Sequence, residues 1–335
     1  MSASTATVVT LGEALVAIAP ETPARLQEAP ALRMHVGGAE VNVAVGLARL
    51  GVGAEWAGRL GDDPFGRLVL RALEAEGVTP RASIDPDRPT GLYLREWLPD
   101  GARRPYYYRR GSADAALSPE DWRPERWHPG GAPYSWLHVT GITCALGPAP
   151  RAAVETAVQW AGTHGCMVSL DPNHRPQLWG DEEARAALLP LVAPCAALLL
   201  SVEDARLLFG HVAPDAVIAA ARAAGARTVV LKRGPLGAVA SDGTVTVEVP
   251  AVRAAAPVDP VGRATRSTPA SSPPWSAAPT CAPPWLWART RAPVPWRSPA
   301  STPAARASPT SPTTCAGASP PRPRRAADRA AGPPR

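Results

Sequence analysis

Short apolar runs alternate with helical stretches along the first 262 of 335 residues, and this alternation constrains the fold more than any other feature. Apolar runs typical of buried strands cover residues 7–11, 136–140, 167–171, 197–201 and 228–232. Helical spacing of Ala and Leu marks residues 42–50, 151–163, 182–192 and 214–224. Strands separated by helices of this length form βαβ units. We therefore predict an α/β fold with a mostly parallel sheet.

The pattern stops after Gly262. Residues 263–335 are rich in Pro, Ser, Thr, Ala and Arg, with one leucine, no isoleucine and four tryptophans. They carry 11 of the 35 basic residues and one of the 29 acidic residues, which leaves 24 basic and 28 acidic residues before them. The basic isoelectric point therefore belongs to the tail and says nothing about the partners of residues 1–262. We divide the chain into a domain at 1–262 and a separate segment at 263–335.

Three interpretations of residues 263–335 are open. The first is a disordered Pro-rich tail, and the second is an arm that binds nucleic acid through Arg and Trp. The third is a shifted reading frame, because Lys232 is the only lysine and such a bias indicates GC-rich coding DNA. A back-translation of residues 263–272 into GC-rich codons, read two bases later, gives Gly-Asp-Ala-Phe-Asp-Ala-Gly-Phe-Leu. We favour the shifted frame, and we expect no nucleic-acid partner.

The remaining bulk features indicate a cytoplasmic protein without a membrane partner. No apolar run is long enough to span a bilayer, and the first seven residues lack the basic start of a secretory signal. The five cysteines are odd in number and have no metal-ligand spacing, so we expect them to be reduced.

Two features of the first half suggest a polar ligand. Gly37 and Gly38 precede a predicted helix that carries Asn42, and glycines permit a close backbone approach, although a simple packing turn would look similar. Residues 90–96 and 104–113 predict a β-ribbon with three consecutive tyrosines, followed by Arg109. Such a ribbon could pack on a second subunit, or it could cover a ligand with a flat aromatic face and a forked cation.

Polar residues also follow three predicted strands, where ligands of parallel α/β sheets bind. They are Asn173 and Arg175 after the third strand, Ser201 and Asp204 after the fourth, and Lys232, Arg233, Gly234 and Gly237 after the fifth. Each group also has a structural alternative. Arg175 could form a salt bridge, Ser201 could cap a helix, and the segment from Lys232 to Gly237 could form a β-turn.

These motifs, in this order over residues 7–262, resemble the PfkB/ribokinase family of carbohydrate kinases, most closely its 2-keto-3-deoxygluconate kinases. The resemblance implies an α/β/α sandwich with a β-lid from about 15–35 and 88–110. It also implies transfer of a phosphoryl group from ATP, with Mg²⁺, to the 6-hydroxyl of the sugar acid. The implied substrate-binding residues are Gly38, Asn42, Tyr93, Tyr107, Arg109 and Arg175. The implied ATP-binding residues are Asn173, Ser201, Lys232, Arg233, Gly234, Gly237 and Gly262, with Asp204 as a metal ligand.

Residues 258–262 begin a second family signature that continues Ala-Gly-Asp in the relatives, where the aspartate acts as the catalytic base. Here the position of that aspartate holds Thr265, which cannot serve as a carboxylate base. We therefore expect the chain as written to have no catalytic residue and to be inactive. The alternatives are a fructokinase-like or ribokinase-like specificity, or a truncated non-catalytic pseudokinase. An intact form is expected to be a homo-oligomer, because lids of this family often make dimer contacts.

Overall fold

The computed structural model describes residues 7–98, 103–131 and 134–251, all within the first of two compact units, residues 1–299. The second unit, residues 300–335, lies outside the described residues, and so does the predicted boundary between 262 and 263.

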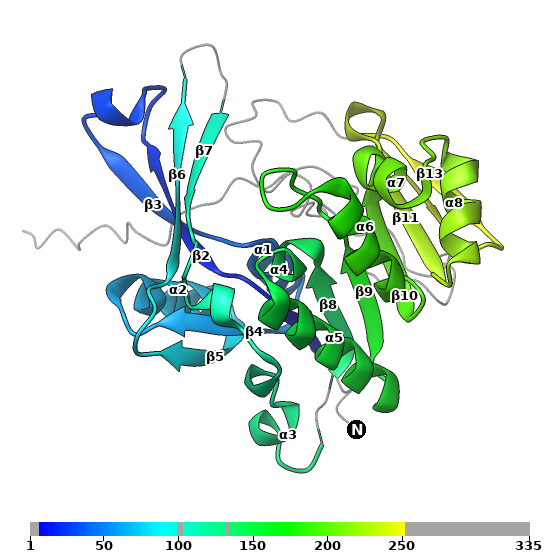
Figure 1. The fold of residues 1–335 in the computed structure, drawn as a ribbon, viewed down its shortest axis with the longest axis horizontal. Coiled ribbons are helices and arrows are strands. Elements are labelled where there is room, and N and C mark those ends of the chain that lie inside the picture. The colour runs from blue at the N-terminus through cyan, green and yellow to red at the C-terminus, as the bar shows by residue number, and fades with distance from the viewer. Residues whose placement is uncertain (1–6, 99–102, 132–133, 252–335) are drawn as a thin grey trace, which may run out of the picture. The chain divides into compact units, whose positions relative to one another are not determined.

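Nine strands of the described residues form one sheet in the order β13-β12-β11-β10-β9-β8-β1-β4-β5 (Figure 1). Their bounds are β1 Thr7–Leu11, β4 Gly53–Gly61, β5 Val78–Asp85, β8 Tyr134–Thr140, β9 Met167–Asp171, β10 Cys195–Ser201, β11 Thr228–Lys232, β12 Ala238–Ser241 and β13 Thr246–Val249. All neighbours from β11 to β5 are parallel, and β12 and β13 add antiparallel strands at one edge. The predicted α/β fold with a mostly parallel sheet is confirmed.

Helices connect these strands, as the sequence pattern predicts. Their bounds are α1 Ala39–Arg49, α2 Pro64–Ala75, α3 Pro124–Trp127, α4 Gly141–Cys144, α5 Pro148–Thr163, α6 Asp181–Leu188, α7 Val202–Phe209 and α8 Pro214–Ala223. The helix predicted over 182–192 is too long, because α6 ends at Leu188 and continues as the short 3-10 helix η4, Leu189–Leu191. Pro190 explains the difference, since proline lacks the N–H that an α-helix needs at that position.

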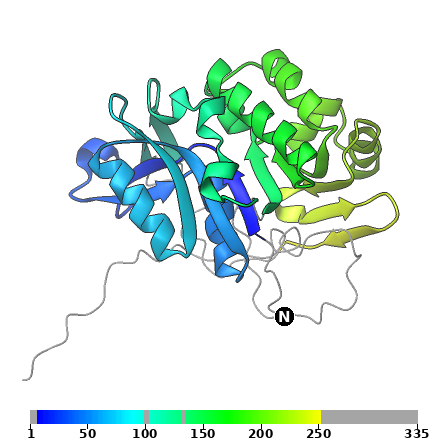
Figure 2. The same cartoon turned by 90° about the horizontal axis from the view of Figure 1, so that it is seen from below.

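The sheet buries an apolar cluster on each face. Leu198 and Leu200 of β10 belong to one cluster, whereas Ala197 and Leu199 belong to the other, as the alternation of side chains along a strand requires. Helices α5 to α8 contribute to the first cluster and gather on one side of the sheet (Figure 2). Helices α1 and α2 contribute to the second and contact β1, β4, β5 and β8. In the described part of the chain, the helices that pack on β10 and β11, α7 and α8, belong to the first face.

A second sheet of four strands, in the order β3-β2-β6-β7, forms the predicted lid (Figure 1). Its strands are β2 Leu15–Pro20, β3 Leu32–Gly37, β6 Gly91–Trp97 and β7 Arg103–Tyr108. Strands β2 and β6 are parallel, and each also pairs antiparallel with an outer strand. The chain therefore passes between the main domain and the lid at four places, and these four connections form the root of the lid.

Cys144, Cys166 and Cys195 are buried free thiols, which agrees with the expectation of reduced cysteines, while Cys281 and Cys315 lie outside the described residues. No helix among the described residues is long and apolar enough to cross a membrane.

The central strand β10 offers a direct test of this packing. Leu198 is fully buried between the sheet and its helices, so Leu198→Ala should lower the free energy of unfolding by about 2–5 kcal/mol through lost burial and a residual cavity. Leu236→Ala, at a position 69% exposed, should change it by less than about 0.5 kcal/mol. Urea denaturation measures both, and equal effects at the two positions would contradict the assigned core.

Candidate active site

The root of the lid brings together residues from the segments that lead into and out of it. Glu13 lies between β1 and β2, Gly38 lies between β3 and α1, and Arg109 directly follows β7. Gly91 begins β6, and a β-carbon placed there would lie 3.5 Å from Cβ of Arg109 and 3.6 Å from Cβ of Leu15. All four connections are therefore packed against one another at this point.

A closed ring of contacts runs through this root. The Arg109 guanidinium donates to Oε2 of Glu13 at 2.6 Å and lies over the Tyr107 ring, 4.4 Å from its centroid. The Tyr107 ring lies 5.7 Å from that of Tyr93, opposite it in the β6–β7 register. A β-carbon at the neighbouring Gly37 would lie 3.4 Å from the Tyr93 ring. Of the residues predicted to hold the sugar, the structure thus groups Tyr93, Tyr107 and Arg109.

Gly38 closes the ring on its other side. Its φ of 140° is a conformation that residues with a β-carbon rarely adopt, and an added β-carbon would lie 2.3 Å from the backbone oxygen of Glu13. Asn42 lies one helical turn further, where its backbone N–H donates to the carbonyl of Gly38 at 3.0 Å. The diglycine turn therefore fixes the start of α1 directly against Glu13.

Two buried atoms of the ring, Oε1 of Glu13 and Nε of Arg109, have no hydrogen-bond partner in the part of the chain that the structure describes. Both side chains are nearly inaccessible, at 2% and 9% exposure. Unpaired buried polar atoms of this kind are costly in a folded protein, and a ligand that supplies a matching donor and acceptor would satisfy them.

Two further buried carboxyl groups, those of Asp114 and Glu40, interact electrostatically with Glu13 of the ring. Asp114 accepts hydrogen bonds from the backbone N–H of Ala14 at 3.1 Å and of Arg59 at 3.2 Å. Glu40 accepts from the hydroxyls of Thr140 and Thr143, each at 2.7 Å. Burial raises the pKa of Glu13 despite the Arg109 charge, and burial with the neighbouring Glu13 carboxylate raises the pKa of Asp114 well above its usual value. Burial raises the pKa of Glu40 to about 7, against the lowering effect of the two threonine hydroxyls.

The residues predicted to hold ATP lie along the carboxyl ends of β9, β10 and β11. Ser201 and Lys232 are register partners at the ends of β10 and β11, and Lys232 reaches across β10 to bind Oδ2 of Asp171 at 2.8 Å. Asn173 follows Asp171 with a φ of 43°, the left-handed conformation that asparagine tolerates better than most residues. An ammonium group at this edge of a parallel sheet can contact a phosphate.

The other predicted nucleotide residues have structural partners. Arg233 forms an ion pair with Glu248, and its backbone N–H donates to the carbonyl of Gly237 at 2.7 Å. Gly234 begins the 3-10 helix η5, Gly234–Leu236. Gly237 has a φ of 86°, and a β-carbon there would lie 2.0 Å from the Val249 carbonyl oxygen. A glycine is therefore required at 237 to pack against β13, whether or not a ligand binds.

Ser201 and Asp204 form a capping box at the start of α7, so the N-cap alternative for Ser201 is confirmed. The two Asp204 oxygens accept from the backbone N–H groups of His174 at 3.0 Å and Ser201 at 2.9 Å. The described residues contain no cluster of three or more His, Cys, Asp or Glu able to hold a metal ion. Mg²⁺ commonly keeps several waters and binds substrate phosphates. The role of Asp204 at a magnesium site stays a prediction.

Two predicted groups lie away from the ring or outside the described residues. Arg175 is exposed in the loop after β9, and its side chain forms no hydrogen bond or ion pair within residues 7–98, 103–131 and 134–251. Gly262 and Thr265, the expected positions of the second signature, lie outside the described residues.

Sequence reasoning did not single out Glu13, Glu40 or Asp114. A usable signal existed for Glu13, because it follows the first predicted strand by two residues, at the edge where ligands of parallel sheets bind. Asp114 and Glu40 lack such a signal, since each depends on contacts with segments far away in the sequence.

Comparison with known proteins agrees with this architecture. Residues 5–262 match the model of the pfkB family of carbohydrate kinases. A 2-dehydro-3-deoxygluconokinase of Thermoproteus tenax is 33% identical over 69% of this chain and 70% of its own length. A fructokinase of Escherichia coli is 37% identical over 63% of this chain and 65% of its own length. An E. coli protein assigned as ribokinase II, solved with ATP and Mg²⁺, superposes with a TM-score of 0.69 at 26% identity, over 77% of this chain and 82% of that chain.

The fold and these matches define a phosphotransferase that acts on an alcohol group. The chain belongs to the pfkB family of carbohydrate kinases.

The raised pKa of Glu40 makes stability depend on pH. As pH rises from about 4.5 to about 7, the unfolded chain loses the Glu40 proton while the folded chain retains it, so the free energy of unfolding falls. Glu40→Gln cannot ionise and should remove roughly 2–3 kcal/mol of the decline between pH 5 and pH 8. Urea denaturation at both pH values measures this.

The exposed Glu28 provides the matched control, because Glu28→Gln should leave the decline unchanged. A Glu40→Gln variant with the pH dependence of the wild type would contradict the buried, protonated carboxyl group.

Proposed function

We propose that the intact form of this protein transfers the γ-phosphoryl group of ATP to the 6-hydroxyl of 2-keto-3-deoxygluconate. The observation that carries the proposal is the ring at the root of the lid, with its unpaired Arg109 Nε and Glu13 Oε1. A sugar acid offers a carboxylate or hydroxyl oxygen to the arginine and a hydroxyl proton to the glutamate. The T. tenax relative supports the same substrate.

Tyr93 and Tyr107 complete the proposed sugar pocket. Their rings lie 5.7 Å apart at the base of β6 and β7, where they can cover the sugar and exclude water during transfer. Arg175 could supply a second cation for the carboxylate from the loop after β9. Because it is exposed and without a side-chain partner in the described residues, it is available for that contact.

Fructose is the second candidate substrate, and one observation favours it. The Glu13 carboxylate lies 2.6 Å from Arg109 and offsets its charge, which weakens the attraction of a substrate carboxylate. A neutral sugar would satisfy the same two atoms with hydroxyl groups. The similarity to the E. coli fructokinase is consistent with this alternative.

For the nucleotide, we propose the carboxyl ends of β9 to β11. ATP with Mg²⁺ would supply the transferred phosphoryl group and neutralise its charge. Lys232 would contact the phosphates from its position beside Asp171, and Asn173 would present its side chain from the left-handed turn. Arg233 and Gly234 would border the nucleotide along the segment that follows β11.

We further propose that the chain as written does not catalyse transfer and that residues 263–335 derive from a frameshift. Thr265 stands where the family signature has its catalytic aspartate. In the described residues, α7 and α8 pack on only one face of β10 and β11, whereas the restored frame encodes residues typical of a helix that could cover the other. Resequencing the gene across codon 263 tests this, and a gene with no base inserted or lost near that codon would exclude it.

We propose that the lid of the intact protein pairs with a second copy. Leu32 and Met34 lie on the same face of β3 and are exposed, at 47% and 52%, and neighbouring exposed apolar side chains commonly mark protein interfaces. Tyr108, which is 64% exposed, lies on β7 at the opposite edge of the lid sheet.

In the frame-restored protein, Arg109→Lys should lower kcat/KM for 2-keto-3-deoxygluconate about 10–100-fold, because lysine lacks the forked donors that hold both Glu13 and the substrate. The neighbouring Arg110 is exposed, so Arg110→Lys is the matched control and should leave kcat/KM unchanged. A coupled ADP-release assay measures both variants with each sugar. A higher kcat/KM for fructose than for the sugar acid in the unsubstituted protein would reject the proposed substrate in favour of the alternative.

A further inference from the structure

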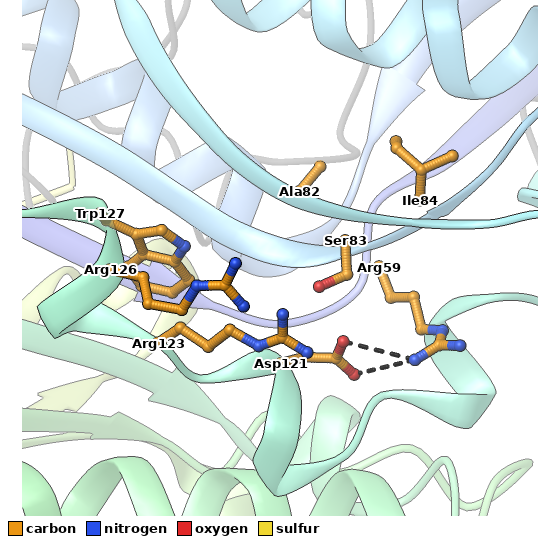
Figure 3. A pocket seen from close by; sticks show the side chains of 8 residues that line it. All are labelled: Arg59, Ala82, Ser83, Ile84, Asp121, Arg123, Arg126 and Trp127. Carbon is orange, nitrogen blue, oxygen red and sulfur yellow. Dashed lines mark hydrogen bonds and ion pairs between the residues drawn. The ribbon is translucent and has the colours of Figure 1, made fainter.

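A cavity of about 520 Å³ lies at the β5 edge of the nine-stranded sheet (Figure 3). Its lining residues come from β4, β5 and the segment of η3 (Pro119–Asp121) and α3: Arg59, Ala82, Ser83, Ile84, Asp121, Arg123, Arg126 and Trp127. None of them is among the residues proposed to hold the sugar or ATP. The volume lies within the range of small-molecule sites.

Two carboxylates offset the positive charge of Arg59 at this cavity. Its guanidinium donates to Asp85 at 3.0 Å and to Asp121 at 3.2 Å. Asp121 also accepts from the backbone N–H of Ser118 at 2.9 Å, which fixes its carboxylate in place. Asp121, the acidic residue among those that line the cavity, is therefore already engaged by Arg59 and by the local backbone.

The positive charges of Arg123 and Arg126 are not offset by carboxylates in this way. Arg123 donates to the backbone carbonyl of Glu120, and neither arginine forms an ion pair with a carboxylate within the described residues. Figure 3 shows both guanidinium groups directed into the same space. Two adjacent like charges repel each other, and an anion between them relieves that repulsion.

The rest of the wall suits a small phosphorylated molecule. Ser83 adds a hydroxyl group that points toward the arginines, whereas the side chains of Ala82 and Ile84 lie on the opposite face of β5. The Trp127 ring is held edge-on against Trp122, with centroids 5.4 Å apart, so it provides a fixed flat surface. Guanidinium groups match the geometry of phosphate oxygens, because their donors lie in a planar fork.

We propose that this cavity is a binding site for a phosphate dianion, either free phosphate or the phosphate group of a small ester, with Arg123 and Arg126 as its principal ligands. Arg59 and Ser83 contribute further donors, and the ester's organic part lies against the Trp127 ring.

Isothermal titration calorimetry at low ionic strength tests the site with inorganic phosphate, glycerol 3-phosphate and uncharged glycerol. The full chain and the frame-restored protein both contain the cavity and are titrated in parallel. We expect saturable binding of the two phosphorylated probes and none of glycerol. Tighter binding of glycerol 3-phosphate would identify an ester as the ligand, and equal binding would identify phosphate itself.

The double variant Arg123→Gln/Arg126→Gln should weaken phosphate binding at least tenfold. The matched control, Arg25→Gln/Arg71→Gln, removes the same charge from exposed positions outside the cavity and should leave the affinity unchanged. Circular dichroism verifies that both variants are folded.

Three results would overturn the proposal. One is the absence of phosphate binding, and another is an equal loss of affinity in the control variant. The third is binding that survives Arg123→Gln/Arg126→Gln but is lost in Lys232→Gln, which would place the phosphate at the carboxyl end of β11 instead.

Discussion

The buried ion pair between Glu13 and Arg109 joins the two sheets of this protein, and the geometry of the candidate sugar site depends on it. Glu13 follows β1, an interior strand of the nine-stranded sheet, whereas Arg109 follows β7, the last strand of the lid. The 2.6 Å contact therefore fixes the root of the lid against the main domain. Removal of one partner from a buried pair leaves an uncompensated charge, so both residues must be retained together.

Under the proposed function, the same pair also influences which sugar the site binds. An arginine already balanced by a glutamate is a directional donor rather than a strong positive field. Discrimination between a sugar acid and a neutral sugar then depends on hydrogen-bond geometry, the tyrosine faces and any second cation.

The sequence predicted the class of fold because buried strands of a parallel sheet are continuous apolar runs. The predicted strands 7–11, 167–171 and 228–232 have the observed bounds. The prediction of a helix over 182–192 was wrong at its C-terminal end. The apolar spacing continues past Pro190, although the α-helical backbone cannot continue through it. The tyrosine ribbon was predictable from its alternating side chains, whereas the substrate-binding role of Arg109 follows from the family resemblance and stays a prediction.

The buried carboxyl groups and the arginine cavity could not be predicted in this way. Glu40 lies 100 residues from Thr140, and its protonation depends on burial that no local pattern records. Arg59 lies on β4, whereas Arg123 and Arg126 belong to one segment much later in the chain, and the fold brings them to the same cavity. Tertiary contacts of this kind arise from the fold as a whole rather than from periodicity.

ATP-dependent phosphorylation of 2-keto-3-deoxygluconate, measured for the chain as written and for the frame-restored protein, tests the account most directly. We predict activity only in the restored protein. Its reading frame encodes the catalytic aspartate of the family signature, whereas the chain as written has Thr265 at that position. Equal activity in the chain as written would contradict the account, since residues 263–335 would then supply a catalytic group that the family signature does not contain.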